Sequence, residues 1–326
     1  MQSSILISGG NDWKIMSKSS KRTRYSDCYI TKLQTIGTAS RQIAVASKSW
    51  NPIQDFMGHH LLFTNQDELM MLGNEKCKIL KYGRWFNHSK FNESRWSLDS
   101  FVIQMPKAIF LFGTDGTSTF RRCYEYLLNG SHSWSLGEIP DGNDFDFWYS
   151  FGLAISPNEL LIMGGKNLPG DIIPYAARRK IMTFNVDDNT WTHFGNLRVA
   201  RYCANAVLIN NKIIISGGND TNNELTNLRS TEIMTLQKRT KSHETELQHT
   251  FLVDIREGGD SVFSRRGQTF MGLVHIENKT KLIIFGGDSP IEEWDEETES
   301  WNSSNVSPPS VQSNFGYYYK PQSLNF

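Results

Sequence analysis

Arginines stand shortly before several short apolar segments of this chain, and they are the residues whose chemistry is most distinctive. A guanidinium group is planar, always charged, and binds carboxylate or phosphate oxygens through two parallel N–H donors. The pattern therefore favours recognition of an anionic group. The arginines nearest to such segments are Arg121, Arg122, Arg178, Arg179 and Arg229.

Other groupings give weaker grounds for chemistry. His59 and His60 are the closest pair among eight histidines, and neighbours on a strand point to opposite faces. The carboxylates of "EEWDEETE" (292–299) diverge in the same way, which favours a solvated edge over a calcium site. A nucleophile elbow and a phosphate-binding loop are both missing from the sequence. We expect no metal, no cofactor and no catalytic residues.

Composition bounds the class of protein. The 34 basic and 34 acidic residues balance, so general affinity for nucleic acid or membranes is not expected. No apolar run is long enough to span a bilayer, and the start of the chain does not resemble a signal peptide. Four dispersed cysteines suit reduced thiols. These features predict a cytoplasmic chain, expected to be monomeric, with a secreted protein as the alternative if the N-terminus is incomplete.

A repeated pattern of strands organises the sequence. In "NNKIIISGGND" (210–220), β-branched residues form a strand that ends in two glycines. Five more segments end in glycine, three with a pair and two with a single glycine, and the spacing averages about 55 residues, close to a kelch period of about 50. The glycines are Gly9, Gly10, Gly73, Gly113, Gly164, Gly165, Gly217, Gly218, Gly286 and Gly287.

Each unit contains three further strands. An apolar strand precedes the glycine strand in most units, a third strand follows a loop, and a tryptophan often opens a fourth strand. The fifth unit carries a polar insert, "QKRTKSHETELQH" (237–249), expected at an outer edge. We expect the glycines and tryptophans to be structural. The tryptophans are Trp96, Trp134, Trp191 and Trp301.

These units resemble the kelch repeat family. The resemblance implies an all-β, six-bladed propeller over residues 1–326, with four antiparallel strands in each blade. Because the chain begins at a glycine strand, "FGYYY" (315–319) is expected to supply the innermost strand of the first blade and close the ring. A truncated chain is the alternative. The expected blades are 1–57 with 312–326, 58–99, 100–147, 148–199, 200–265 and 266–311.

The resemblance also places the arginines. In kelch propellers, the loops from second to third strands and between blades crowd one mouth of the channel. A ring of guanidinium groups there would focus positive potential on an acidic partner segment. The alternative is that these arginines only hold neighbouring blades together. The proposed partner-binding residues are Arg24, Arg122, Arg179, Arg201, Arg229, Arg266 and Tyr175.

The resemblance implies a non-catalytic scaffold or adaptor that binds a protein partner. Two alternatives remain open at this point. One is an enzyme of the galactose oxidase-like or sialic acid epimerase-like kind on the same fold. The other is a secreted, glycosylated recognition protein, favoured by N-x-S/T sequons. Those sequons begin at Asn87, Asn92, Asn129, Asn219, Asn278, Asn302 and Asn305.

Overall fold

The computed structural model describes 26 strands and some of the segments between them. The longest continuously described segments are 148–167 and 176–220. The described residues are 4–8, 11–14, 21–24, 28–33, 43–45, 60–63, 69–73, 76–81, 84–90, 101–105, 108–114, 121–127, 134–137, 148–167, 176–220, 228–238, 251–263, 270–276, 279–286, 289–303 and 316–318.

Six four-stranded antiparallel sheets make up most of the structure, and we number them along the chain. Sheet 1 contains β26 (Gly316–Tyr318), β1 (Ser4–Ser8), β4 (Cys28–Leu33) and β5 (Ile43–Val45). Sheet 2 contains β6 (His60–Phe63), β7 (Leu69–Gly73), β8 (Lys76–Lys81) and β9 (Arg84–Lys90). Sheet 3 contains β10 (Phe101–Gln104), β11 (Ala108–Thr114), β12 (Arg121–Leu127) and β13 (Trp134–Gly137).

The other three sheets follow the same order. Sheet 4 contains β14 (Phe151–Ala154), β15 (Glu159–Met163), β16 (Lys180–Asn185) and β17 (Thr190–Asn196). Sheet 5 contains β18 (Asn205–Ile209), β19 (Lys212–Ser216), β20 (Thr231–Lys238) and β21 (Phe251–Gly258). Sheet 6 contains β22 (Phe270–Ile276), β23 (Lys279–Gly286), β24 (Ser289–Asp295) and β25 (Ser300–Ser303).

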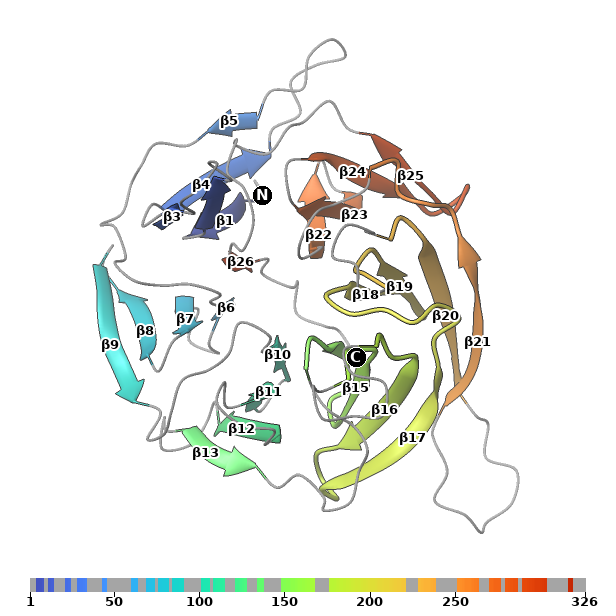
Figure 1. Ribbon diagram of the computed structural model, residues 1–326, viewed down its shortest axis with the longest axis horizontal. Coiled ribbons are helices and arrows are strands. Elements are labelled where there is room, and N and C mark those ends of the chain that lie inside the picture. The colour runs from blue at the N-terminus through green and yellow to red at the C-terminus, as the bar shows by residue number, and fades with distance from the viewer. Residues whose placement is uncertain are drawn as a thin grey trace.

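The sheets are set around a common centre (Figure 1). Labelled strands β26, β6, β10, β18 and β22 lie nearest the centre, and β9, β13, β17, β21 and β25 lie outside. Neighbouring inner strands are in contact from β26 through β6, β10, β14 and β18 to β22. The prediction of an all-β chain of four-stranded antiparallel sheets is confirmed. Closure of the six sheets into a propeller stays a prediction.

The C-terminal strand pairs with the start of the chain. In β26, Tyr318 lies opposite Leu6 of β1, and Gly316 lies opposite Ser8. A segment more than 300 residues away therefore supplies the fourth strand of sheet 1, as "FGYYY" predicted. This pairing gives β1 a neighbour on the edge that β4 does not cover.

Among the described side chains, apolar layers lie between sheets 3 and 4, sheets 4 and 5, and sheets 5 and 6. Between sheets 3 and 4, Phe112 and Phe184 are buried and both contact the ring of Trp191. Ile215 belongs to the layer between sheets 4 and 5. Trp301 lies in the layer between sheets 5 and 6, where its indole N–H donates to the Thr231 hydroxyl. A single sheet buries too little apolar area to be stable, so each sheet depends on its neighbours.

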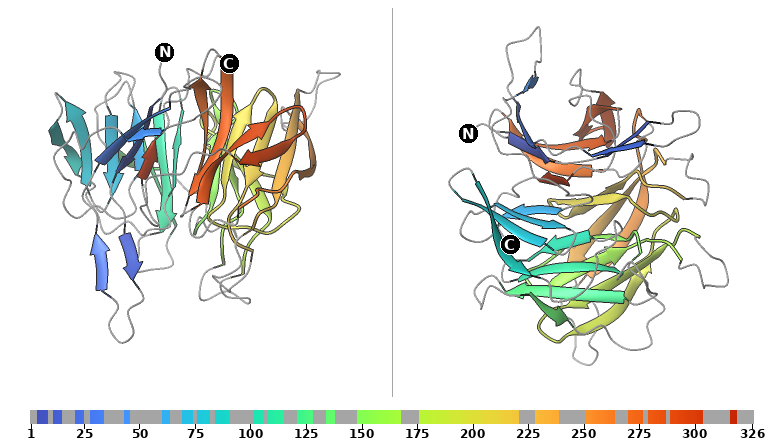
Figure 2. Two further views of the ribbon diagram at one scale, coloured as in Figure 1. Left: turned by 90° about the horizontal axis from the view of Figure 1, so that it is seen from above. Right: turned by 60° about the vertical axis from the view of Figure 1, so that its left-hand side comes forward.

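Two elements differ from the sequence prediction. The loop expected after β1 contains an additional hairpin of β2 (Asn11–Lys14) and β3 (Lys21–Arg24), set apart from the six sheets (Figure 2). The fourth strand of sheet 2 is β9, with Arg84 opposite Lys81, so Trp96 does not open that strand. Only two residues separate β8 from β9, a spacing typical of a tight hairpin turn rather than the longer connection expected.

Ion pairs fasten sheet 5 to sheet 6. The Glu299 carboxylate, in the turn between β24 and β25, accepts hydrogen bonds from both terminal nitrogens of Arg256 and from Lys212 Nζ at 2.9 Å. The Glu299 carbonyl accepts from the Gly259 amide at 2.8 Å. The Arg256 guanidinium, and then the Lys212 ammonium, hold the pKa of Glu299 at about 2, below its ordinary 4.5. These contacts stabilise the folded form of the ionised carboxylate.

The Glu299 contacts predict a defined acid sensitivity. A depressed pKa stabilises the folded state above pH 4.5, and this stabilisation is lost as the pH falls toward 2. Glu299→Gln should therefore lower the Tm near pH 7 by a few degrees and show a shallower loss between pH 4.5 and 2. Thermal unfolding of both proteins across this range measures it. Parallel curves would contradict the assignment.

The pairing of β26 with β1 predicts a role for the C-terminus in stability. Deleting residues 312–326 should lower the Tm sharply, because it removes the whole of β26. Deleting only residues 319–326 is the matched control, since it leaves Gly316–Tyr318 in place. Calorimetry of the three proteins makes the comparison. An equal Tm for the wild type and the longer deletion would contradict the stabilising role of the pairing.

Candidate functional site

Two glycines allow two inter-sheet linkers to meet at the end of β15. Gly164 and Gly165 have φ of +61° and +100°, which residues with a Cβ rarely adopt. A Cβ on Gly164 would lie 2.3 Å from the Arg201 carbonyl oxygen, and one on Gly165 would lie 2.3 Å from Ser150 Oγ. The linkers before β14 and before β18 therefore both pack onto this turn, which brings residues distant in sequence to one end of the sheets.

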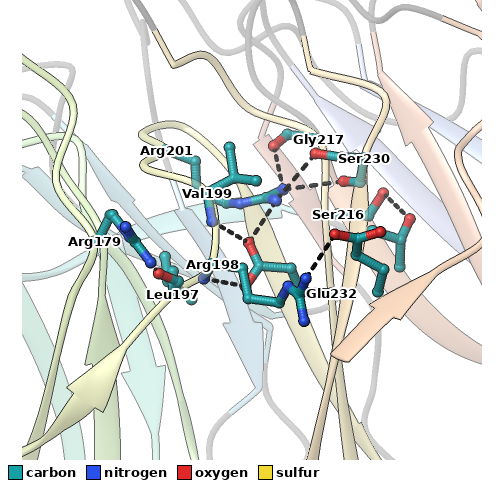
Figure 3. A network of polar contacts seen from close by, with 11 residues as sticks. Arg179, Leu197, Arg198, Val199, Arg201, Ser216, Gly217, Ser230 and Glu232 are labelled. Atoms are coloured by element: carbon teal, nitrogen blue, oxygen red, sulfur yellow. Dashed lines mark hydrogen bonds and ion pairs between the residues drawn. The ribbon is translucent and has the colours of Figure 1, made fainter. Parts of the chain in front are cut away.

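Arg201 lies buried at this end of the sheets, between sheets 4 and 5 (Figure 3). Its guanidinium pairs with the buried carboxylate of Glu232 at 2.7 Å, with both side chains at most 1 % exposed. It also donates to the Gly217 and Ser230 carbonyls, each at 3.0 Å. Burial lowers the pKa of Arg201 from its ordinary value, while the Glu232 carboxylate opposes that change. Arg201 is therefore a structural residue, and its burial argues against the predicted contact with a partner.

Glu232 also binds the linker backbone. Its two carboxylate oxygens accept from the amides of Arg198 and Val199 at 2.7 and 3.1 Å (Figure 3). The Arg198 side chain reaches outward instead, to a solvent-exposed pair with Glu257 at 2.8 Å. A buried carboxylate with several donors is strongly fixed, whereas an exposed pair contributes about 0–1 kcal/mol. The linker from sheet 4 is thus held on sheet 5 mainly through Glu232.

Arg179 and Arg229 occupy equivalent positions in sheets 4 and 5. In sheet 4, Met163 precedes the first glycine and pairs with Ile181, and Arg179 lies two residues before Ile181. In sheet 5, Ser216 precedes the first glycine and pairs with Thr231, and Arg229 lies two residues before Thr231. Arg179 Nε donates to the Leu197 carbonyl at 2.5 Å, and the Leu197 amide donates back to the Arg179 carbonyl at 2.7 Å.

Arg229 repeats this arrangement in the next sheet. Its Nε donates to the Ser261 carbonyl at 2.6 Å, and the Ser261 amide donates to the Arg229 carbonyl at 2.8 Å. Both arginines are exposed. Within the described part of the chain, only Nε of each guanidinium has a hydrogen-bond partner. Val262, next to Ser261, is 45 % exposed and adds an apolar surface beside Arg229.

The register also changes which arginine of sheet 3 matches this pair. Cys123 lies opposite Phe112, the residue before Gly113, so Arg121 and not Arg122 is equivalent to Arg179. Both residues lie within β12, not in the preceding loop as expected. Arg24 likewise lies in a strand, β3, opposite Asn11. Counting back from the third strand of each sheet would have identified Arg121 from the sequence.

Several predicted residues lie outside the described part of the chain. They include two proposed partner-binding residues, three repeat glycines and one tryptophan. These residues are Tyr175, Arg266, Gly9, Gly10, Gly287 and Trp96. Of the other repeat residues, Gly73, Gly113, Gly286 and Trp134 lie in strands β7, β11, β23 and β13.

The described residues contain no group of three His, Cys, Asp or Glu side chains arranged to hold a metal ion. None of the described segments is a helix of the length and apolar character needed to cross a membrane. They do contain two exposed guanidinium groups on neighbouring sheets, those of Arg179 and Arg229, and each has one nitrogen hydrogen-bonded to a linker carbonyl. That arrangement suits binding of an anionic partner.

The fold and this site define the described part of the chain as all-β, with four-stranded antiparallel sheets and exposed arginines at equivalent positions of two neighbouring sheets. A scan of family models finds a match over residues 178–316 to Recombination activating protein 2. The matched segment begins two residues before β16, ends at the first residue of β26 and covers less than half of the chain. No individual curated protein matches.

This match corrects two predictions and agrees with a third. No kelch family model matches, so the kelch assignment is replaced by similarity to recombination activating protein 2, whose own fold is a kelch-like propeller. That family is nuclear, which contradicts the expected cytoplasmic location. It is also a non-catalytic cofactor of a recombinase, in agreement with the prediction that this chain is not an enzyme.

The buried pair predicts a large effect of Arg201. Arg201→Met should destabilise the protein by about 3–5 kcal/mol, because the Glu232 charge would remain buried without its cation. The double variant Arg201→Met, Glu232→Gln should recover part of the loss, since the amide still accepts from the linker. Arg229→Ala is the control and should cost about 1 kcal/mol. Urea unfolding measures all three, and equal losses for Arg201 and Arg229 would contradict this distinction.

Proposed function

We propose that the chain is a closed six-bladed propeller that binds an acidic segment of a protein partner. Three features support the proposal: six four-stranded sheets, contact between successive inner strands, and pairing of the two chain ends. Radial packing of this kind leaves one set of connections gathered at each end of the ring. The connections that carry Arg179 and Arg229 form the binding face in this proposal.

The observation that carries the proposal is that only one nitrogen of each guanidinium group, Nε, is hydrogen-bonded within the described part of the chain. Nε binds the linker carbonyl, which fixes the plane of the group. The terminal nitrogens have no hydrogen-bond partner among the described residues, and a fixed planar fork loses less conformational entropy on binding than a freely moving side chain. Holding the linker and binding a partner therefore use different atoms of the same residue, so the two interpretations of these arginines are compatible.

The ligand chemistry follows from charge and position. Two guanidinium groups at matched positions on neighbouring sheets suit two carboxylates on one partner segment. The exposed side chain of Val262 offers that segment an apolar contact beside Arg229. By analogy with the matching family, which acts with the RAG1 recombinase, we propose a recombinase of that type as the partner.

The double variant Arg179→Ala, Arg229→Ala should weaken partner binding about tenfold or more, because each charged hydrogen bond contributes about 1.5–3 kcal/mol. Arg198→Ala is the matched control, since it removes an exposed arginine whose terminal nitrogen is already paired with Glu257. Calorimetric titration against the purified recombinase, and against a polyglutamate peptide, measures both variants. The wild-type affinity should fall with added salt.

Two outcomes would contradict the proposal. Equal losses for the double variant and for Arg198→Ala would indicate a general charge effect in place of a specific site. A double variant with wild-type affinity would leave Arg179 and Arg229 with a structural role only. Circular dichroism and Tm of each variant separate loss of binding from loss of folding.

A further inference from the structure

Three aromatic rings surround the ammonium group of Lys166. Its Nζ lies 4.6 Å from the ring centroid of Tyr202, 5.8 Å from that of Trp148 and 5.9 Å from that of Tyr149. Lys166 is only 8 % exposed, whereas Trp148 and Tyr149 are half-buried. The rings, which we call the aromatic box, therefore surround a largely buried cation, and two of the three rings are partly exposed to solvent.

The backbone builds this box from three separate segments. The Lys166 amide donates to the Trp148 carbonyl at 2.8 Å, and Lys166 forms a β-bridge with Ala177. The Gly165 amide donates to the Arg201 carbonyl at 2.9 Å, which holds the segment that bears Tyr202. The Lys166 backbone is thus fixed from both sides, and its four-carbon side chain carries the ammonium to the rings.

One residue of the box, Tyr149, and the residue that follows Tyr202, Cys203, adopt a left-handed backbone conformation. Tyr149 has φ of 55° and Cys203 has φ of 53°, and the Cys203 amide donates to the Tyr149 carbonyl at 3.0 Å. Each stands two residues before the first residue of an inner strand, β14 or β18. Such conformations are strained in residues with a Cβ and cluster at functional sites. The ring centroids of Tyr149 and Tyr202 lie 6.0 Å apart.

We propose that the aromatic box is a binding site for an alkylammonium group of a partner, and that Lys166 occupies it in the free protein. Faces of Trp and Tyr attract cations through the ring quadrupole, and an ammonium without strong hydration binds best. Lys166 shows by its own position that the box fits this chemistry. The site is distinct from the arginine pair and takes a ligand of opposite charge.

Exchange requires a movement of the Lys166 side chain out of the box. The Lys166 ammonium sits on a flexible stem, so it leaves the box by rotamer changes without disturbing the bonds of its backbone. Self-occupancy lowers the apparent affinity for an external cation by the fraction of molecules whose box is empty. Emptying the box by mutation should therefore raise the affinity, and this competition is the signature of the site.

The test titrates choline into the full chain and follows binding by calorimetry. Lys166→Ala empties the box and should bind choline at least about tenfold more tightly than the wild type. Lys166→Met is the matched control, because it fills the box without charge and should show no such gain. Uncharged dimethylbutanol, in which carbon replaces the choline nitrogen, should bind none of the proteins measurably.

Each result bears directly on the proposal. Equal choline affinity in the wild type and Lys166→Ala would overturn it, since the ligand would not compete with Lys166. Equal binding of choline and dimethylbutanol to Lys166→Ala would also overturn it, because the cavity would then be only apolar. Trp148→Leu in the Lys166→Ala background should weaken choline binding, and a wild-type Tm for Lys166→Ala would show that a folded protein was measured.

Discussion

The contacts on which the described part of this molecule most depends are those of the buried carboxylate of Glu232. It binds the amides of Arg198 and Val199 and the guanidinium of Arg201, all from the linker that leaves sheet 4. A buried carboxylate without donors would strongly destabilise the fold, so the linker must follow one path onto sheet 5. That path sets where the flanking strands begin, and with them the exposed arginines.

The same solution recurs between sheets 5 and 6. Glu292 is fully buried and accepts from the Ser261 hydroxyl at 2.5 Å and the Val262 amide at 2.6 Å. Glu292 lies opposite Ile284, as Glu232 lies opposite Ile215. Carboxylates at matched positions of two sheets thus receive the incoming linkers. Apolar layers give the sheets a general attraction, while these carboxylates specify the connection between them.

The described arginines have different tasks because their surroundings differ. Arg201 is enclosed and neutralises Glu232, whereas Arg198 forms an exposed pair on the outside of the same linker. Arg179 and Arg229 use one nitrogen to fix a linker and keep the others at the surface. Sequence reasoning placed Arg179, Arg201 and Arg229 in one set because all three precede strands. Their separation from the next strand in the sequence did not distinguish them, because the burial of Arg201 depends on Glu232, about 30 residues further along the chain.

The sequence by itself determined most of the strands, the glycine turns after β15 and β19, and the order of the six sheets, because alternating apolar segments and Gly-Gly pairs are local signals. It also predicted the pairing of "FGYYY" with the first strand. Tertiary structure alone decided that Arg201 is buried against Glu232 and that Lys166 sits among three rings. These results depend on linkers folding back over neighbouring sheets, and contacts between distant segments leave no periodic trace in a single sequence.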